Sequence, residues 1–512
     1  MSLTRRELLL SAGLSAGAGV LLSGCNASEP GSAPVQASGS ATPRQGGTLR
    51  AVFTGGGATE SLDPFAGGAP VDLVRHDVVF DSLFTFRGNE LAPALAKSAT
   101  PAKDGRSFVL KLREGVVWHD GSKFTAQDVL ASFKYMSAPQ RPYPSELSAY
   151  FDFAAAKVVD ELTLQVPTRQ AVGDPALLLA AFPAKIVKSG VTATKAIGTG
   201  PYRVAAFAAG RETRLKKFDQ YWDGPAFADE IVLASLTDPQ AKVNAVLTGS
   251  ADYTADIPYT SAKTGTNSPD LEIRTAGDLG RVGFGFVLNA TRAPFRDPRA
   301  RKAVRLGIDR QALVDSVLLG YGEPANDLFG AGSKYFSNRE PLARNVDEAR
   351  KLVKDAGIEG ATVTFRTAEY EIGYNASTQL LAEQLKDIGI TVKADVVGVP
   401  EFFDVKALGQ TDGIVFSIGA IPLLVAYTRL AAYPTLGLPD NQLRGAVTTA
   451  LASVDEKERQ RAWVSVQDVM ADRGNTVVWG LADTLSIARK NVAGVEVRGQ
   501  AKYPYLGKAG LA

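Results

Sequence analysis

Residues 107–128 read SFVLKLREGVVWHDGSKFTAQD, a stretch that combines a strand, a turn and the start of a helix. Apolar and polar side chains alternate over residues 108–112, which is the pattern of a half-buried strand. Asp120-Gly121 is a strong turn signal. Thr125 followed by Asp128, with apolar residues at helical spacing beyond it, predicts a capped helix. The stretch therefore indicates a fold that mixes α-helices with β-strands.

Similar local signals occur on both sides of this stretch. Residues 48–53 predict a first strand, residues 157–166 a hairpin, and Asp238-Pro239 the capped start of a helix. Beyond residue 282, predicted strands and helices alternate, which indicates a second α/β lobe. The predicted elements there are strands at 282–288, 362–366 and 391–397, helices within 299–319 and at 347–356, 376–388, 441–453 and 456–472, and strands over 476–489.

Length and composition limit the classes of protein to consider. A chain of 512 residues allows roughly three domains. Its 56 basic and 54 acidic side chains leave a net charge of +2, so no strong positive field attracts nucleic acid. One cysteine cannot form an internal disulfide and, with only His76 and His119, cannot complete a zinc cluster. We therefore expect no nucleic-acid partner, no metal and no cofactor.

The first residues have the features of a bacterial export signal. The basic pair Arg5-Arg6 precedes an uncharged run at residues 8–24, which is shorter than the roughly 20 apolar residues of a membrane span. The pair resembles a twin-arginine signal, and Leu-Ser-Gly before Cys25 resembles a lipobox with Cys25 as the lipidated residue. A generic cleaved signal is the alternative. Residues 26–46 are rich in Ser, Gly, Ala and Pro and predict a flexible tether.

Two motifs that invite a catalytic interpretation favour turns instead. Gly198-Thr199-Gly200 lacks the third glycine of a dinucleotide fingerprint and is followed by Pro201, which predicts a tight turn. His119-Asp120 would suit acid–base chemistry, but the Asp120-Gly121 signal favours a turn packed by Trp118. His76 lies in an apolar stretch and is expected to be a surface or core histidine.

A basic run in the second half invites a phosphate-site interpretation. The run lies on a predicted helix beside apolar residues, so we expect a solvated face or an inter-lobe surface instead. Its members are Arg299, Arg301, Lys302, Arg305 and Arg310.

Several strings, taken in their order along the chain, resemble one family. They are LAPALA at 91–96, DGRSFVLKLREGVVWHDG at 104–121, FTAQDV at 124–129, IGTGPY at 197–202, FDQYWDG at 218–224, LN at 288–289, PFRDP at 294–298, RKA at 301–303, IDR at 308–310 and LLAEQLKDIG at 380–389. Together they resemble the family 5 extracellular solute-binding proteins of bacterial ABC importers, which include dipeptide-, oligopeptide- and nickel-binding proteins.

The resemblance implies an α/β, two-lobed periplasmic-binding-protein fold, type II and cluster C-like, with an extra subdomain in lobe I. The implied boundaries are an export signal at 1–24, a lipid-anchored tether at 25–46, lobe I at 46–60, 185–272 and 481–512, the extra subdomain at 61–184 and lobe II at 273–480. The chain is expected to cross between the lobes near 273–277 and near 477–481, where closure around a ligand would bend it.

The resemblance also implies a ligand held between the lobes. Peptide-binding members generally offer a carboxylate to the peptide's α-amine from a stretch resembling G-W-x-x-D-Y-x-D-P. Residues 417–427, SIGAIPLLVAY, contain neither the tryptophan nor the aspartates. An unpaired buried ammonium costs on the order of several kcal/mol. We therefore expect weak or no binding of free-amine di- to pentapeptides, and better binding of a blocked or less charged ligand with apolar surface.

Glu60 is the best remaining partner for a ligand cation. The other predicted ligand-binding residues lie at strand ends and in loops that face a cleft between lobes. The full predicted set is Thr54, Thr59, Glu60, Phe286, Asn289, Tyr370, Tyr374, Phe416, Ile418 and Tyr427.

The expected function is that of an exported lipoprotein at the outer face of the cytoplasmic membrane. It would bind a small organic or peptide-like solute and deliver it to ABC permease subunits. We expect a monomer without enzyme activity, and no nickel ligand, because residues 273–480 contain no histidine. A non-transport receptor and a secreted hydrolase with a carboxylate pair are the alternatives. Neighbouring permease and ATPase genes would favour transport.

Replacing Cys25 by serine tests the lipid anchor. A serine hydroxyl cannot take the place of the thiol in lipidation, so Cys25→Ser should move the protein from the membrane fraction to the soluble fraction, as measured by fractionation and immunoblotting. An unchanged membrane fraction contradicts the anchor.

Replacing Arg5 and Arg6 by lysine should block export, and normal export of that variant contradicts the twin-arginine interpretation.

Overall fold

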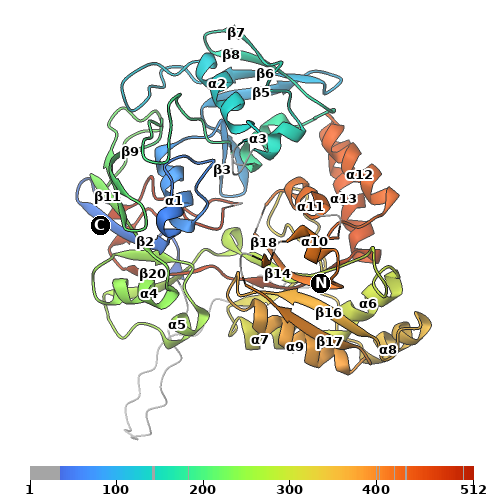
Figure 1. Cartoon of the computed structure of the whole chain (residues 1–512). Helices are drawn as coiled ribbons and strands as arrows, with labels where there is room; N and C mark the ends of the chain where they lie inside the picture. Colours follow the sequence, from blue (N-terminus) through green and yellow to red (C-terminus); the bar gives the residue numbers. More distant parts are fainter. Residues whose placement is uncertain are drawn as a thin grey trace, which may run out of the picture. The chain divides into compact units, whose positions relative to one another are not determined.

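The computed structural model describes residues 35–140, 145–182, 184–398, 401–402, 404–419, 421–432, 435–499 and 501–512. These residues belong to one unit, Ala33–Ala512. Arg5, Arg6 and Cys25, which are predicted to carry the export signal and the lipid, lie outside the described residues. Two large sheets, each with its own helices, organise the described chain (Figure 1).

The first sheet is built around the strand predicted at residues 48–53, which is confirmed as β2 (Thr48–Thr54). β2 pairs in parallel with β11 (Glu230–Leu236) on one side and β12 (Tyr253–Ala255) on the other. Its apolar side chains are buried on both faces. The full strand order is β1 (Val35–Gln36), β13 (Leu271–Thr275), β20 (Leu485–Arg489), β12, β2, β11, β10 (Glu212–Lys217) and β9 (Tyr202–Ala208).

The second sheet is built around β14 (Val282–Leu288), in which every residue is buried. β14 lies between β18 (Gly413–Gly419) and β19 (Thr476–Ala482) and is antiparallel to both. A strand without solvent contact reads as a continuous apolar run, here VGFGFVL. The full order is β15 (Gly322–Pro324), β19, β14, β18, β16 (Thr362–Thr367) and β17 (Thr391–Val396).

A smaller antiparallel sheet and two two-stranded pairs contain the remaining described strands. The hairpin predicted at residues 157–166 is confirmed as β7 (Lys157–Asp160) and β8 (Thr163–Pro167). With β6 (Ser107–Leu112) and β5 (Ala96–Pro101) it forms a four-stranded sheet in the order β5, β6, β8, β7. The remaining pairs are β3 (Phe84–Arg87) with β4 (Glu90–Pro93) and β21 (Val492–Ala493) with β22 (Gly510–Leu511).

Helices begin where the sequence places caps. Thr125 precedes α2 (Ala126–Met136), and its backbone N–H donates to Asp128 Oδ2 at 2.8 Å. Asp238 caps α4 (Pro239–Leu247) by accepting from the Ala241 N–H at 2.6 Å. Both predictions are confirmed. The other helices are α1 (Pro70–Val79), α3 (Pro175–Ala181), α5 (Tyr259–Thr264), α6 (Pro298–Gly307), α7 (Arg310–Val317), α8 (Val346–Asp355), α9 (Tyr374–Lys386), α10 (Val405–Leu408), α11 (Leu423–Ala432), α12 (Asn441–Ala452) and α13 (Glu456–Arg473).

The described chain passes between the two sheets at two short connections. One joins β13 to β14 through residues 276–281, and the other joins β19 to β20 through residues 483–484. The predicted crossing near 477–481 therefore falls inside β19, and the one near 273–277 falls partly inside β13. β13 and β19 each end before the chain crosses to the other sheet.

Part of the segment predicted as a flexible tether is attached to the fold. β1 pairs in parallel with β13, and Ala37 is buried. The fully buried Arg274 donates to the Ala37 carbonyl oxygen at 3.2 Å. The Gly46 N–H donates to the Phe227 carbonyl at 2.8 Å. The prediction of a free tether is thus incorrect from Val35 onward, because backbone pairing holds a stretch whose composition is otherwise typical of linkers.

Three arginines of the basic run in α6 and α7, Arg301, Arg305 and Arg310, are buried, whereas Arg299 and Lys302 are exposed. The prediction of a solvated face is therefore wrong for the three buried arginines. Arg301 Nε donates to the Gly474 carbonyl at 3.1 Å, and Arg305 donates to the Ala471 carbonyl at 2.7 Å. They satisfy carbonyl groups at the C-terminal end of α13, which have no partner within the helix. Arg301 and Arg305 therefore attach α6 to α13.

The turn predicted at Trp118–Gly121 is confirmed. The Gly121 N–H donates to the Trp118 carbonyl at 2.8 Å, and the Trp118 ring is fully buried. His119 Nδ1 accepts from the Gly198 N–H at 3.2 Å, while Nε2 lies 3.0 Å from the Gly200 carbonyl. Burial lowers the pKa of His119 to about 4, so the ring is neutral near pH 7. His119 therefore joins two turns and has a structural role.

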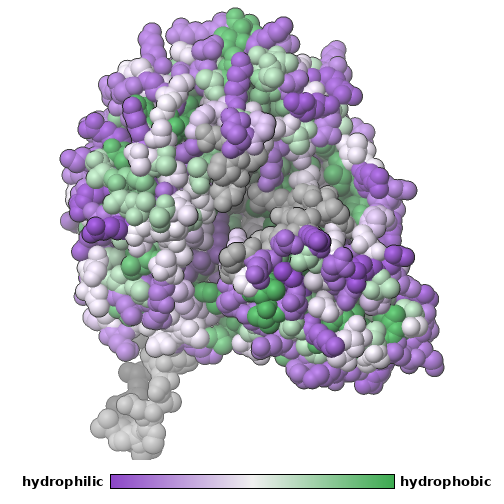
Figure 2. All heavy atoms as spheres, in the orientation of Figure 1, coloured by the Kyte–Doolittle hydropathy of each residue, from purple (hydrophilic) through white to green (hydrophobic). Residues whose placement is uncertain are grey.

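Hydrophilic and hydrophobic residues are interspersed over the face of the molecule drawn in Figure 2. Among the described residues, no helix is both long enough and apolar enough to cross a membrane.

Gly198→Ala tests how closely the turn at residues 198–200 approaches the end of α1. A Cβ at Gly198 would lie 1.8 Å from the Val79 carbonyl oxygen, which belongs to the backbone and cannot rotate away. We expect the free energy of unfolding, measured by urea denaturation, to fall by about 1–3 kcal/mol. Gly445→Ala is the control, because a Cβ there meets no atom within 4 Å. Equal stability of the two variants would contradict the close approach.

Candidate ligand-binding site

A cavity of about 300 Å³ lies between α1, β3, α3, the C-terminal segment at 498–503 and Ile421. Its wall is mostly apolar and aromatic, as in typical small-molecule sites. Ile421, which follows β18, brings the second sheet's side of the molecule to the cavity. The described lining residues are Pro64, Leu73, His76, Asp77, Ser82, Phe84, Thr85, Phe86, Ala180, Ala181, Phe182, Lys185, Ile421, Arg498, Gly499, Ala501, Lys502 and Tyr503.

The charged groups of this wall have partners within the protein. Lys185 Nζ lies 2.7 Å from Asp77 Oδ1. Arg498 Nε donates to Glu496 Oε1 at 3.1 Å, and its guanidinium lies 3.3 Å from the centre of the Tyr505 ring. The wall therefore offers a ligand apolar surface and ion pairs that are already formed.

His76 is neutral in this wall. Burial, assisted by the positive charge of Arg75, lowers the pKa of His76 to about 3. Its Nε2 lies 2.8 Å from the Ser61 carbonyl oxygen, which accepts a hydrogen bond from the neutral ring. Of the two predicted alternatives, a surface or a core histidine, His76 is thus the core histidine.

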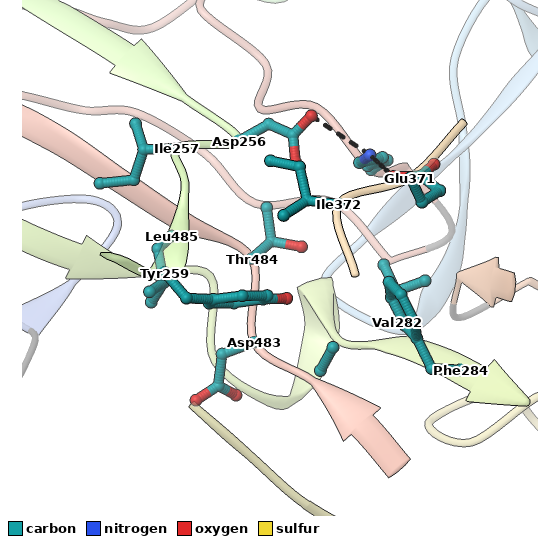
Figure 3. A pocket seen from close by; sticks show the side chains of 12 residues that line it. Asp256, Ile257, Tyr259, Val282, Phe284, Glu371, Ile372, Asp483, Thr484 and Leu485 are labelled. Atoms are coloured by element: carbon teal, nitrogen blue, oxygen red, sulfur yellow. Dashed lines mark hydrogen bonds and ion pairs between the residues drawn. The ribbon is translucent and has the colours of Figure 1, made fainter. Parts of the chain in front are cut away.

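Lys502 joins the first cavity to a second, much smaller one of about 20 Å³ (Figure 3). Its Nζ lies 2.6 Å from Glu371 Oε2 and 3.2 Å from Asp256 Oδ2. Burial raises the pKa of the Glu371 carboxyl, although Lys502 opposes this. Burial also disfavours the charge of Lys502, but Asp256, Tyr503 and Glu371 outweigh it and raise the pKa of the ammonium well above its ordinary value. Lys502 is therefore protonated near pH 7.

None of the ten side chains predicted to bind ligand is among the described residues that line the 300 Å³ cavity. Glu60 is buried, and its carboxylate lies 3.3 Å from Arg75 Nη2 and also accepts from the Gly56 N–H and the Ser235 hydroxyl. Arg75 is itself fully buried and holds Asp72 at 2.8 Å. Glu60 therefore compensates a cation of the protein itself.

Other predicted residues have structural contacts. Phe286 is fully buried in β14 and packs edge-on against Phe365. Asn289 Nδ2 donates to the Thr411 carbonyl at 3.0 Å, and Asn289 Oδ1 accepts from Thr291. Thr54 ends β2, and the hydroxyl of the exposed Thr59 donates to the Gly56 carbonyl at 2.8 Å.

The structure brings four of the predicted residues near the end of β18. Tyr374 begins α9 and donates to the Ser417 hydroxyl at 2.7 Å, and the exposed Tyr370 stacks on Phe402. Phe416 and Ile418 belong to β18 itself. Tyr427 lies apart, in a groove lined by α11 and α12. A part for these residues in ligand binding stays a prediction.

Lys185, Arg498 and Lys502 are not among the residues that the sequence predicts to bind ligand. No motif surrounds them, and they come from two segments about 300 positions apart. The nearest sequence signal is the aromatic C-terminal stretch KYPYL at 502–506, in which Tyr503 packs edge-on against Phe53 of β2. Among the described residues, no cluster of His, Cys, Asp or Glu side chains could hold a metal ion.

Two sheets joined by two short crossings, with a small cavity lined by residues of both sheets and of one crossing, form the architecture of a two-lobed binding protein. The sequence matches the family described as "Bacterial extracellular solute-binding proteins, family 5 Middle" over residues 90–424. The chain belongs to this family, which confirms the resemblance drawn from the sequence.

Individual relatives agree in fold. The chain is 25% identical to the glutathione-binding protein GsiB of Salmonella paratyphi A over 460 residues, which cover 85% of this chain and 89% of GsiB. The periplasmic binding protein DppA of Helicobacter pylori, in complex with the peptide STSA, superposes with a TM-score of 0.75 at 20% identity, covering 91% of this chain and 98% of DppA. NikA of Staphylococcus aureus, in complex with Ni(L-His)2, gives 0.72 at 19% identity, covering 91% and 100%. The α/β, two-lobed fold is thereby confirmed.

Arg75→Met tests whether the Glu60 network is structural. Removing the cation leaves two buried carboxylates uncompensated, so the free energy of unfolding should fall by about 3–5 kcal/mol in urea denaturation. Arg214→Met, which removes a solvent-exposed pair with Glu212, should cost much less. If Glu60→Gln weakens solute binding while stability stays unchanged, Glu60 serves the ligand and this assignment is wrong.

Proposed function

We propose that the chain is the lipid-anchored, solute-binding component of an ABC importer. It captures a small organic or peptide-like solute in the 300 Å³ cavity and delivers it to a membrane permease without chemical change. Family membership and the two-lobed fold support the binding role. The lipobox-like stretch before Cys25 supports an anchor at the outer face of the cytoplasmic membrane.

The observation that carries this proposal is a cavity that brings proposed lobe I and its subdomain together with Ile421 of proposed lobe II. A solute that touches residues of both proposed lobes gains its second set of contacts only when the lobes approach, so its binding favours the closed arrangement. A permease can then distinguish loaded from empty protein by shape. Lobe I at 46–60, 185–272 and 481–512, the subdomain at 61–184 and lobe II at 273–480 are the moving parts that we propose.

A second contact set lies between the proposed subdomain and lobe II. The Gly173 N–H donates to the Leu451 carbonyl at 2.8 Å, and Arg459 of α13 lies 3.8 Å from the Asp174 carboxylate. Gly173 lies so close to the end of α12 that a Cβ there would meet the Ser453 carbonyl oxygen at 1.7 Å. Residue 173 of the proposed subdomain can therefore approach the end of α12 this closely only if it is glycine.

The cavity wall supports a solute of limited net charge with apolar surface. Leu73, Phe84, Phe86 and Phe182 supply apolar contacts. Among the described lining residues, the one carboxylate, Asp77, is already paired with Lys185. The relatives named above bind glutathione, a peptide and a nickel–histidine complex. For this chain we propose a blocked or weakly charged compound of peptide-like size rather than a simple free-amine peptide.

Gly173→Ala, combined with identification of the solute, tests the proposal. Native mass spectrometry of the chain purified from its own host should reveal a co-purified solute. Its affinity for Gly173→Ala, measured by calorimetry, should fall by at least about tenfold, because a clash of roughly 1.4 kcal/mol or more opposes closure. Gly445→Ala in α12 should bind as the unaltered chain does. Equal affinity for all three proteins contradicts closure at this contact.

A further inference from the structure

Lys502 lies between carboxylates from the two proposed lobes. Asp256 follows β12 of the first sheet, and Glu371 lies between β16 and α9 beside the second sheet. In Figure 3 the side chains of Asp256 and Glu371 point toward the same nitrogen atom. The Lys502 Nζ atom lies 3.2 Å from Asp256 Oδ2 and 2.6 Å from Glu371 Oε2. Lys502 itself comes from the C-terminal segment, which Tyr503 holds against Phe53 of β2.

The ammonium occupies the position that a ligand's amine would need. Such an amine requires a carboxylate partner, and Asp77 on the described wall is engaged with Lys185. Asp256 and Glu371 are the carboxylates that converge next to the cavity, and Lys502 already neutralises them. The space beside them is about 20 Å³, which is room for about one water molecule and not for the backbone of a ligand that carries an amine.

We propose that Lys502 is a specificity-determining residue of the ligand site, in which the protein's own ammonium fills the inter-lobe carboxylate pair and thereby excludes ligands that would bind through a free amine. This inference rests on the proposed function, because it treats the 300 Å³ cavity as the solute site. It deepens that function by giving a physical cause for the rejection of simple peptides.

The same bridge links the proposed lobes directly. Breaking it leaves Asp256 and Glu371 facing each other without a cation, and like charges at short range repel. An amine from solution can relieve that repulsion if it enters from the cavity side. Removing the Lys502 charge should therefore create amine affinity, which is an outcome that simple loss of packing would not produce.

The experiment compares trialanine with N-acetyl-trialanine by isothermal titration calorimetry. For Lys502→Met, the affinity for trialanine should rise at least tenfold over that of the unaltered chain, whereas the affinity for N-acetyl-trialanine should change less than threefold. Glu371→Gln added to Lys502→Met should abolish the gain. Lys508→Met is the matched control, because Lys508 lies in the same segment but donates to the carbonyl oxygens of Asp223 and Gly224.

The outcomes separate this inference from the proposed function. No gain in trialanine affinity for a folded Lys502→Met overturns the role of Lys502, even if the co-purified solute still binds. If Lys502→Met does not fold, the unaltered chain decides. Trialanine binding at least tenfold tighter than N-acetyl-trialanine then overturns the role, and equal or weaker binding supports it. If the unaltered chain does not bind its co-purified solute, the proposed function is contradicted. The role of Lys502 is still decided by whether Lys502→Met gains affinity for trialanine.

Discussion

The two adjacent crossings between the sheets are the constraint on which the site depends. β13 continues into β14 and β19 into β20, and the resulting strands run antiparallel side by side. The Ala276 N–H donates to the Thr484 carbonyl at 2.9 Å, and Arg281 pairs with Asp483 at 2.8 Å. Both covalent links between the two sheets of the described chain lie in this ribbon, so we propose it as the hinge that opens and closes the space between the lobes. The small cavity beside Lys502 includes residues of this ribbon.

Much of the fold could be predicted because its signals are local. Asp238, followed by proline, and Thr125, followed three residues later by Asp128, mark helix starts that depend only on neighbouring groups. The alternation over residues 108–112 marks β6 for a similar reason, since one face of the strand is buried and the other exposed. Ordered strings of modest length then identified the family, which the match over residues 90–424 confirms.

The failures share a different cause, which is that long-range contacts override local composition. Residues 35–46 have a linker's composition, yet pairing between β1 and β13 incorporates their first part into the fold. Arg301 and Arg305 have the spacing of a solvated face, yet carbonyls at the end of α13 receive them. The pairing of Glu60 with Arg75 has no sequence signal either, and a part for Glu60 in ligand binding stays a prediction. No pattern within a few residues of these positions reveals such partners.

The candidate site was the least predictable part for the same reason. Its charged residues, Lys185, Arg498 and Lys502, meet only after the C-terminal segment packs on β2.

The central claim is that a solute is held between two lobes that close on it. Small-angle X-ray scattering of the chain with and without its co-purified solute tests this most directly. The account predicts a smaller radius of gyration when solute saturates the protein, and an unchanged radius at proven saturation would contradict it.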